Sequence, residues 1–212
     1  MSVTLVISFH SSKKFFELLN VVPDPWNVII YNKSPDTNFS LNNSNIKIVN
    51  LPNIGRETDT YLNHIILNYN SISDFTIFIQ DDTHNHIQDY PGFISFVNEH
   101  VNNNLFFQMY PAKYRAGSTS VQKRTFINGC HKASICLPKN AVALSANSLN
   151  LHIPNKYDTF VCAHFICSKK SITNHPLSFY QQLLNWHYTD DAIDRNVKGF
   201  LFEHMWQMLF CS

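Results

Sequence analysis

Short apolar runs recur through the first half of the chain, separated by amphipathic or polar segments. Val3–Phe9 is a continuous apolar run rich in β-branched residues, which predicts a strand buried on both faces. Phe75–Ile79 predicts another buried strand, and the shorter segments Asn27–Tyr31 and Ile46–Leu51 predict two further strands.

The segments between these runs have helical spacing. Ser11 and Ser12 are N-cap residue types ahead of a short apolar face, and they predict a first helix. Thr58–Tyr69 and Pro91–Val101 carry apolar residues at intervals of three and four, which predicts two more helices. The resulting β-α-β-β-α-β-α order predicts an α/β sandwich with a largely parallel sheet.

The second half is less regular. Lys113–Lys123 is basic and polar and is expected to be a loop, and Tyr157–Ser168 contains a further strand. Pro176 opens a helix, and Gly199 precedes a terminal helix with an aromatic face. No linker composition separates these parts, so residues 1–212 are expected to form one domain.

Composition excludes several classes of protein. The 212 residues are 44% hydrophobic and carry a net charge of only +1, which argues against disorder and against a strongly basic nucleic-acid binder. No run approaches the roughly 20 apolar residues that a membrane span needs, so none is expected. The five cysteines form no CxxC pair. They are expected to be reduced thiols in the cytoplasm.

The strongest chemical signal is the pair Asp81 and Asp82, which follows the apolar run Phe75–Ile79. Ligands of open α/β sheets gather at the carboxyl ends of strands. Carboxylate oxygens suit Mg²⁺ or Mn²⁺, whose coordination a bound phosphate can complete. The alternative is an acidic turn that caps the strand. His84 and His86 follow, two residues apart. They are read either as a pair of transition-metal ligands or as surface histidines.

A second candidate segment surrounds Arg56. Gly55 permits a close turn, and the planar guanidinium of Arg56 suits a phosphate at the start of the helix that follows. The alternative is a structural loop in which Arg56 pairs with Glu57 or Asp59.

Glu203 interrupts the apolar, aromatic terminal helix. A carboxylate held among aromatic rings binds its proton more tightly, which fits a general base. The alternative is a glutamate on the polar face of an amphipathic helix. There is no P-loop, no G-x-G-x-x-G and no G-x-S-x-G motif to favour another class of enzyme.

Taken in order, these segments resemble the nucleotide-sugar glycosyltransferases of GT-A fold, and within them a small family found in fungal and large DNA-virus proteins. The length also resembles the N-terminal glycosyltransferase domains of chlorovirus proteins that glycosylate the major capsid protein. The matching pieces span nearly the whole chain: Tyr31-Asn32-Lys33, Asn53-Ile54-Gly55-Arg56-Glu57, Phe78-Ile79-Gln80-Asp81-Asp82 with His86, Ala163–Ser168, Pro176 with Phe179-Tyr180, and Phe202-Glu203-His204-Met205-Trp206.

This resemblance implies a GT-A-like domain in which residues 1–85 bind the nucleotide-sugar and residues 86–212 bind the acceptor. In such enzymes the last acid of an Asp-x-Asp motif ligates Mn²⁺ and an earlier one contacts the sugar or ribose. In this chain the metal would be bound by Asp82, and the sugar or ribose would be contacted by Asp81. The motif here is Gln-Asp-Asp, which leaves that division open.

The resemblance also assigns three further roles. The backbone of Ser8, Phe9 and His10 would hold the nucleobase, and Arg56 would lie near the nucleotide. Glu203 matches the late acid that serves as base in inverting members, and Glu203→Gln is then expected to change donor affinity little.

The expected function is transfer of a sugar from a nucleotide-diphosphate sugar, with a UDP-sugar favoured, to a hydroxyl of a glycan or glycoprotein. Mn²⁺ or Mg²⁺ is the expected cofactor, nucleic acid is not an expected partner, and a viral member would act in the host cytoplasm. One alternative is a sugar-nucleotide hydrolase or nucleotidyltransferase, although Phe9–Ser12 lacks the Gly- and Arg/Lys-rich loop of pyrophosphorylases. Another alternative is a non-catalytic nucleotide- or glycan-binding domain.

Overall fold

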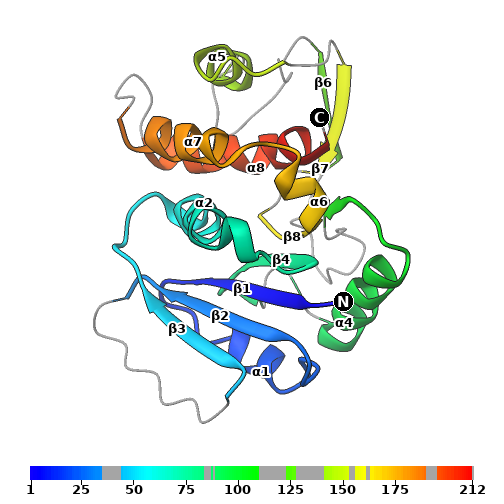
Figure 1. The fold of residues 1–212 in the computed structure, drawn as a ribbon. Coiled ribbons are helices and arrows are strands. Elements are labelled where there is room, and N and C mark those ends of the chain that lie inside the picture. The colour runs from blue at the N-terminus through cyan, green and yellow to red at the C-terminus, as the bar shows by residue number, and fades with distance from the viewer. Residues whose placement is uncertain are drawn as a thin grey trace.

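The computed structural model describes residues 1–34, 44–83, 87, 89–109, 123–127, 141–152, 156–160, 163–189 and 195–211. These residues form an α/β fold in which a mixed, mostly parallel sheet carries helices on both faces (Figure 1). The fold class predicted from the sequence is therefore confirmed.

The central sheet has the strand order β3-β2-β1-β4-β8-β5. The strands are β1 (Val3–Phe9), β2 (Asn27–Asn32), β3 (Ile46–Asn50), β4 (Phe75–Gln80), β5 (Phe107–Met109) and β8 (Phe165–Ser168). Strands β1 to β4 are parallel, β8 is antiparallel to β4, and β5 is antiparallel to β8. Every residue of β1 is buried, as its mostly apolar and β-branched composition predicts.

Helices cover the two faces of this sheet unequally. On one face, α1 (Phe15–Leu19) and α4 (Tyr90–Asn102) pack against the strands in one apolar cluster. The other face carries α2 (Arg56–Asn68), the short η1 (Tyr69–Ser71), α6 (Lys169–Thr173), α7 (Leu177–Thr189) and α8 (Arg195–Cys211). The described residues also include α5 (Ala141–Ser148) and a separate two-stranded sheet of β6 (Lys123–Ile127) and β7 (Lys156–Phe160).

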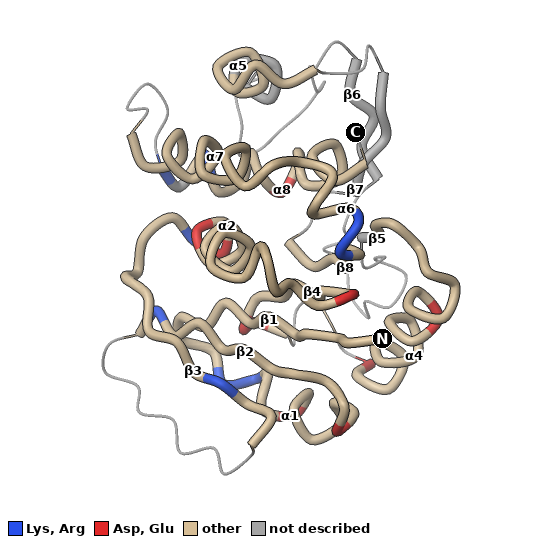
Figure 2. Tube along the Cα trace, in the orientation of Figure 1, with Lys and Arg blue, Asp and Glu red and all other residues tan. Residues whose placement is uncertain are grey.

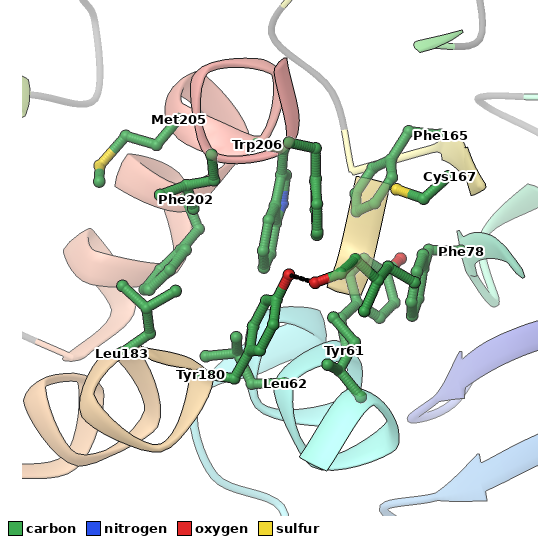
Figure 3. Packing of buried hydrophobic residues seen from close by; sticks show 14 of the residues in the cluster. Tyr61, Leu62, Phe78, Phe165, Cys167, Tyr180, Leu183, Phe202, Met205 and Trp206 are labelled. Carbon is green, nitrogen blue, oxygen red and sulfur yellow. Dashed lines mark hydrogen bonds between the residues drawn. The ribbon is translucent and has the colours of Figure 1, made fainter. Parts of the chain in front are cut away.

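An aromatic cluster fixes α8 against α2 and the sheet (Figure 3). The ring of Trp206 lies 5.0 Å from that of Phe202 and 5.3 Å from that of Phe165 in β8, measured between centroids. The hydroxyl of Tyr61 in α2 donates a 2.8 Å hydrogen bond to the carbonyl oxygen of Ala163. Burial of aromatic rings of this size dominates core energetics. The C-terminal helix is thereby anchored to the first half of the chain.

Two local predictions were wrong. The terminal helix begins at Arg195, so Gly199 lies within its first turns and does not precede it. Helix α1 begins after Lys14 with no side-chain cap, and the Ser12 hydroxyl accepts instead from the Lys14 N–H at 3.4 Å, ahead of the helix. Among the described residues, no helix combines the length and the apolar character needed to cross a bilayer.

Candidate functional site

A cavity of about 540 Å³ opens at the carboxyl ends of β1, β2 and β4. Its walls carry mostly polar and charged side chains: Ser8, His10, Lys33, Asn53, Gly55, Arg56, Glu57, Gln80, Asp81 and Asp82. Its position is the crevice where open α/β sheets bind ligands. Its volume is within the range of small-molecule sites.

Strand register explains why these residues meet. Ser8 of β1 is paired with Gln80 of β4, and Phe9 is paired with Asn32 of β2. The pairing continues one residue further, since the Lys33 N–H donates to the Phe9 carbonyl at 2.9 Å. The three strands therefore end at the same level, and the residues that follow them face one space.

Asp81 binds the loop that follows β1. Its Oδ2 atom accepts hydrogen bonds from the backbone N–H groups of His10, Ser11 and Ser12 at 2.9, 2.8 and 2.8 Å. Hydrogen bonds to an ionised acceptor are stronger than neutral ones, so this carboxylate holds the loop in place. The predicted contact of Asp81 with sugar or ribose stays a prediction. Its Oδ2 atom already accepts three hydrogen bonds from the protein backbone.

Asp82 is the other half of the acidic pair, and it lines the same cavity with part of its surface exposed. Among the described residues, no three His, Cys, Asp or Glu side chains gather into a metal-binding group. A Mg²⁺ or Mn²⁺ ion held through a diphosphate needs only one or two carboxylates, and Asp82 fits that arrangement. His84 and His86 lie outside the described residues.

The start of α2 has an unusual backbone. Gly55 has φ of +69° and Arg56 has φ of +57°, so two consecutive residues adopt the left-handed conformation. A non-glycine residue in this region is strained and persists only where its surroundings hold it. The Lys33 Nζ atom provides that support, because it donates to the carbonyl oxygens of Ile54 and Arg56, each at 2.5 Å.

Lys33 belongs to a buried ionic network. Its Nζ lies 3.2 Å from Asp59 Oδ2, and both side chains are only 2% exposed. Burial lowers the pKa of Lys33, and the neighbouring Asp59 partly reverses that effect. The hydroxyl of Tyr188 in α7 donates to the second oxygen of Asp59. Asp59 is therefore the partner of Lys33, and not of Arg56.

The guanidinium of Arg56 lies between two carboxylates. Its Nε is 3.5 Å from Glu57 Oε2, and its Nη2 is 3.9 Å from Glu203 Oε1 in α8. Its Cζ is 4.0 Å from the centroid of the Phe200 ring, within the range of a cation–π contact. The fold thus brings the two candidates Arg56 and Glu203 together. Figure 2 shows that charged residues of both signs occur along the chain, including in α2.

The first-strand segment is only partly available to a ligand. Ser8 and His10 line the cavity, whereas the Phe9 side chain is 1% exposed in the core. The Ser8 carbonyl accepts from the Asp81 N–H, and the Ser8 hydroxyl is paired with Thr60. The prediction that this backbone holds a nucleobase stays a prediction.

Sequence reasoning missed the roles of Lys33 and Glu57. Lys33 follows a buried strand directly, and its position beside that strand's carboxyl end was a signal that could have marked it. Glu57 is 5% exposed although it is charged, and its burial follows from packing that no local pattern reports. Both side chains line the cavity.

The sequence model of a family described as "Protein of unknown function (DUF3431)" matches residues 15–212, which includes every cavity residue except Ser8 and His10. No curated protein matches the chain.

Proposed function

The chain belongs to the DUF3431 family, and we propose that this member is a metal-dependent glycosyltransferase. It would move a sugar from a nucleotide-diphosphate sugar, with a UDP-sugar favoured, to a hydroxyl group of a glycan or glycoprotein. The description of this family assigns no function.

One observation carries the proposal. Asp82 follows β4, Arg56 begins α2 and Glu203 lies in α8, and the three are linked through one cavity and one ionic contact. Asp82 and Arg56 line the cavity, and Glu203 contacts Arg56 from the side of the C-terminal helix. A metal-binding acid, an anion-binding cation and a second acid are the groups that transfer from a diphosphate needs.

Each of these side chains has a defined role. Asp82 would hold Mn²⁺ or Mg²⁺, which when bound supplies charge stabilisation to the leaving diphosphate. Arg56 binds the diphosphate through its planar fork of N–H donors. Glu203 accepts the proton of the acceptor hydroxyl while that oxygen bonds to the anomeric carbon. The bond from the anomeric carbon to the phosphate oxygen breaks, and its electron pair leaves with the diphosphate.

Calorimetric titration tests the donor part of the proposal. UDP, GDP and their sugars are titrated with and without Mn²⁺, and at least one is expected to bind more tightly with the metal. Asp82→Ala should abolish the metal-dependent part, whereas alanine at the exposed Asp24 should not. Arg56→Lys should weaken binding because the planar fork is lost. Unchanged Mn²⁺-dependent affinity in Asp82→Ala would reject the assigned metal role.

Product analysis separates this function from its alternatives. Transfer is indicated when sugar is released from the bound nucleotide only in the presence of an acceptor. Release of free sugar or of sugar phosphate at equal rates without acceptor indicates the hydrolase. Binding without turnover across a panel of acceptors indicates a non-catalytic domain.

The compartment is part of the same proposal. Cys167 and Cys211 are free thiols within the described part of the chain. This supports action in a reducing cytoplasm, which would be the host cytoplasm for a viral member.

A further inference from the structure

Arg56 is held near two acids without being hydrogen-bonded to either. Its guanidinium carries five N–H donors. None of them makes a hydrogen bond to any residue that the structure describes, although Glu57 and Glu203 lie 3.5 and 3.9 Å away. The side chain is 33% exposed and lines the cavity. Its Nε, which faces Glu57, is buried, so the Nη donors are the ones available to a ligand, at the cost of the long ionic contact to Glu203.

The stem of Arg56 is fixed more firmly than its charged end. A Cβ placed on Gly199 would lie 2.6 Å from Arg56 Cδ, so α8 leaves just enough room for the arginine stem. The ring of Phe200 then lies under the guanidinium. Because backbone and stem are held, the guanidinium can change partners by a small movement but cannot leave the cavity rim.

We propose that Glu57 and Glu203 compete with the diphosphate of the ligand for Arg56. This inference rests on the proposed function, since it takes the ligand to be a nucleotide diphosphate. When phosphate oxygens bind Arg56 in the bidentate geometry they favour, the ionic contact to Glu203 is given up. The carboxylate of Glu203 then no longer contacts Arg56. Donor binding thereby prepares the base.

The two acids lower the affinity of the empty site for anions by occupying Arg56. Glu203→Gln removes one competitor and keeps its shape. The expected result is tighter binding of diphosphate, by roughly threefold, which is the scale of a partly exposed ion pair. This reverses the sequence-based expectation that Glu203→Gln changes donor affinity little.

The test is a double-variant cycle measured by calorimetry with UDP and with inorganic pyrophosphate, at constant Mn²⁺. The variants are Glu203→Gln, Arg56→Met and the combination of both. Glu203→Gln should tighten binding of both probes, and it should have almost no effect when Arg56 is already methionine. Glu57→Gln should act in the same direction as Glu203→Gln. Glutamine at the exposed Glu99 of α4 is the matched control, and it should leave both affinities unchanged.

Three outcomes overturn the inference. An equal gain from Glu203→Gln with and without Arg56 would show a general effect of charge and no competition for the arginine. A loss or no change in Glu203→Gln, with thermal unfolding unaltered, would show that Glu203 does not hold Arg56 back. Failure of the unaltered protein to bind either probe would reject the proposed diphosphate ligand itself, and this result is distinct from the other two.

Discussion

His187 of α7 donates its Nε2 hydrogen to the carbonyl oxygen of Gly55 across 3.1 Å. A carbonyl oxygen can only accept, so Nε2 carries the proton in this contact. Gly55 is the first of the two left-handed residues that start α2, and Arg56 is the second. One buried histidine from the C-terminal half therefore supports the turn that presents the candidate phosphate-binding arginine.

Gly55→Ala should destabilise the protein and weaken diphosphate binding. A Cβ at this position would lie 2.1 Å from His187 Nε2, and φ of +69° is unfavourable for any residue with a Cβ. We expect the free energy of unfolding to fall by about 2 kcal/mol, from backbone strain and displacement of His187 together. Urea denaturation measures the loss.

The same substitution made in a His187→Ala background isolates the two causes. The clash is then removed and the backbone strain remains, so Gly55→Ala should cost about 1 kcal/mol there. Equal costs in both backgrounds would contradict the packing that the structure shows between Gly55 and His187. Asn104→Gly, at another residue with positive φ (+49°), should be close to neutral or slightly stabilising.

Acid should destabilise the fold before most carboxylates titrate. Burial lowers the pKa of His187 to about 4 and that of His64 to about 3, from an ordinary value near 6.5. As the pH falls below 6.5, the unfolded chain takes up protons that the folded chain cannot. Stability is complete above that pH and falls toward pH 4, by up to about 1.4 kcal/mol per pH unit for each histidine.

His187→Gln tests this directly, because a glutamine amide can still donate to Gly55 but does not titrate. Urea denaturation between pH 5 and 6.5 measures the slope of unfolding free energy against pH. The number of protons taken up on unfolding, which sets this slope, should decrease by about one. Glutamine at the exposed His152 should leave the slope as it was. An unchanged slope in His187→Gln would mean that this ring is protonated within the fold.

The strands were predictable from the sequence and the ionic contacts were not. Val3–Phe9 is a strand from end to end, because a run dominated by apolar and β-branched residues, with only the small polar residues Thr4 and Ser8 among them, favours the middle of a covered sheet. The buried pair of Lys33 and Asp59 had no such signal. The two residues look like ordinary surface charges in the sequence, and only the close approach of β2 to α2 buries them.

The acidic pair shows where pattern reasoning stops. The position of Asp81 and Asp82 at the carboxyl end of a strand followed from the apolar run before them. What Asp81 binds did not follow, because the three N–H groups on its Oδ2 belong to residues 10–12, which follow β1 and not β4. The contact of Arg56 with Glu203 likewise depends on the aromatic packing of α8, which no local spacing reports.

Asp81 and Asp82 should therefore respond differently to the same substitution. Asp81→Asn weakens three charge-assisted hydrogen bonds to the β1 loop, and we expect it to lower the free energy of unfolding by about 2–3 kcal/mol. Asp82→Asn should change stability little and should remove the Mn²⁺-dependent part of UDP affinity. Urea denaturation and calorimetry on both variants check the pair. A stable Asp81→Asn, or an Asp82→Asn with intact metal dependence, would contradict the division of roles.

Glu203→Gln makes the most demanding test of the proposed chemistry. The substitution keeps the size of the side chain and its place in α8, but an amide cannot take the acceptor proton. We expect kcat for sugar transfer to fall about 10²-fold, the scale of losing a general base. Affinity for the donor should not weaken, because Glu203 contacts Arg56 as a competitor of the diphosphate.

Steady-state kinetics with saturating donor measure the loss of kcat, and thermal unfolding of the same sample shows that the fold is retained. Glu99→Gln in α4 offers a matched control, because it removes an exposed carboxylate on the other face of the sheet. It should leave kcat unchanged. Turnover close to that of the unaltered protein in Glu203→Gln would show that transfer proceeds without this base. The contact between Glu203 and Arg56 would then serve only to hold the arginine at the cavity rim.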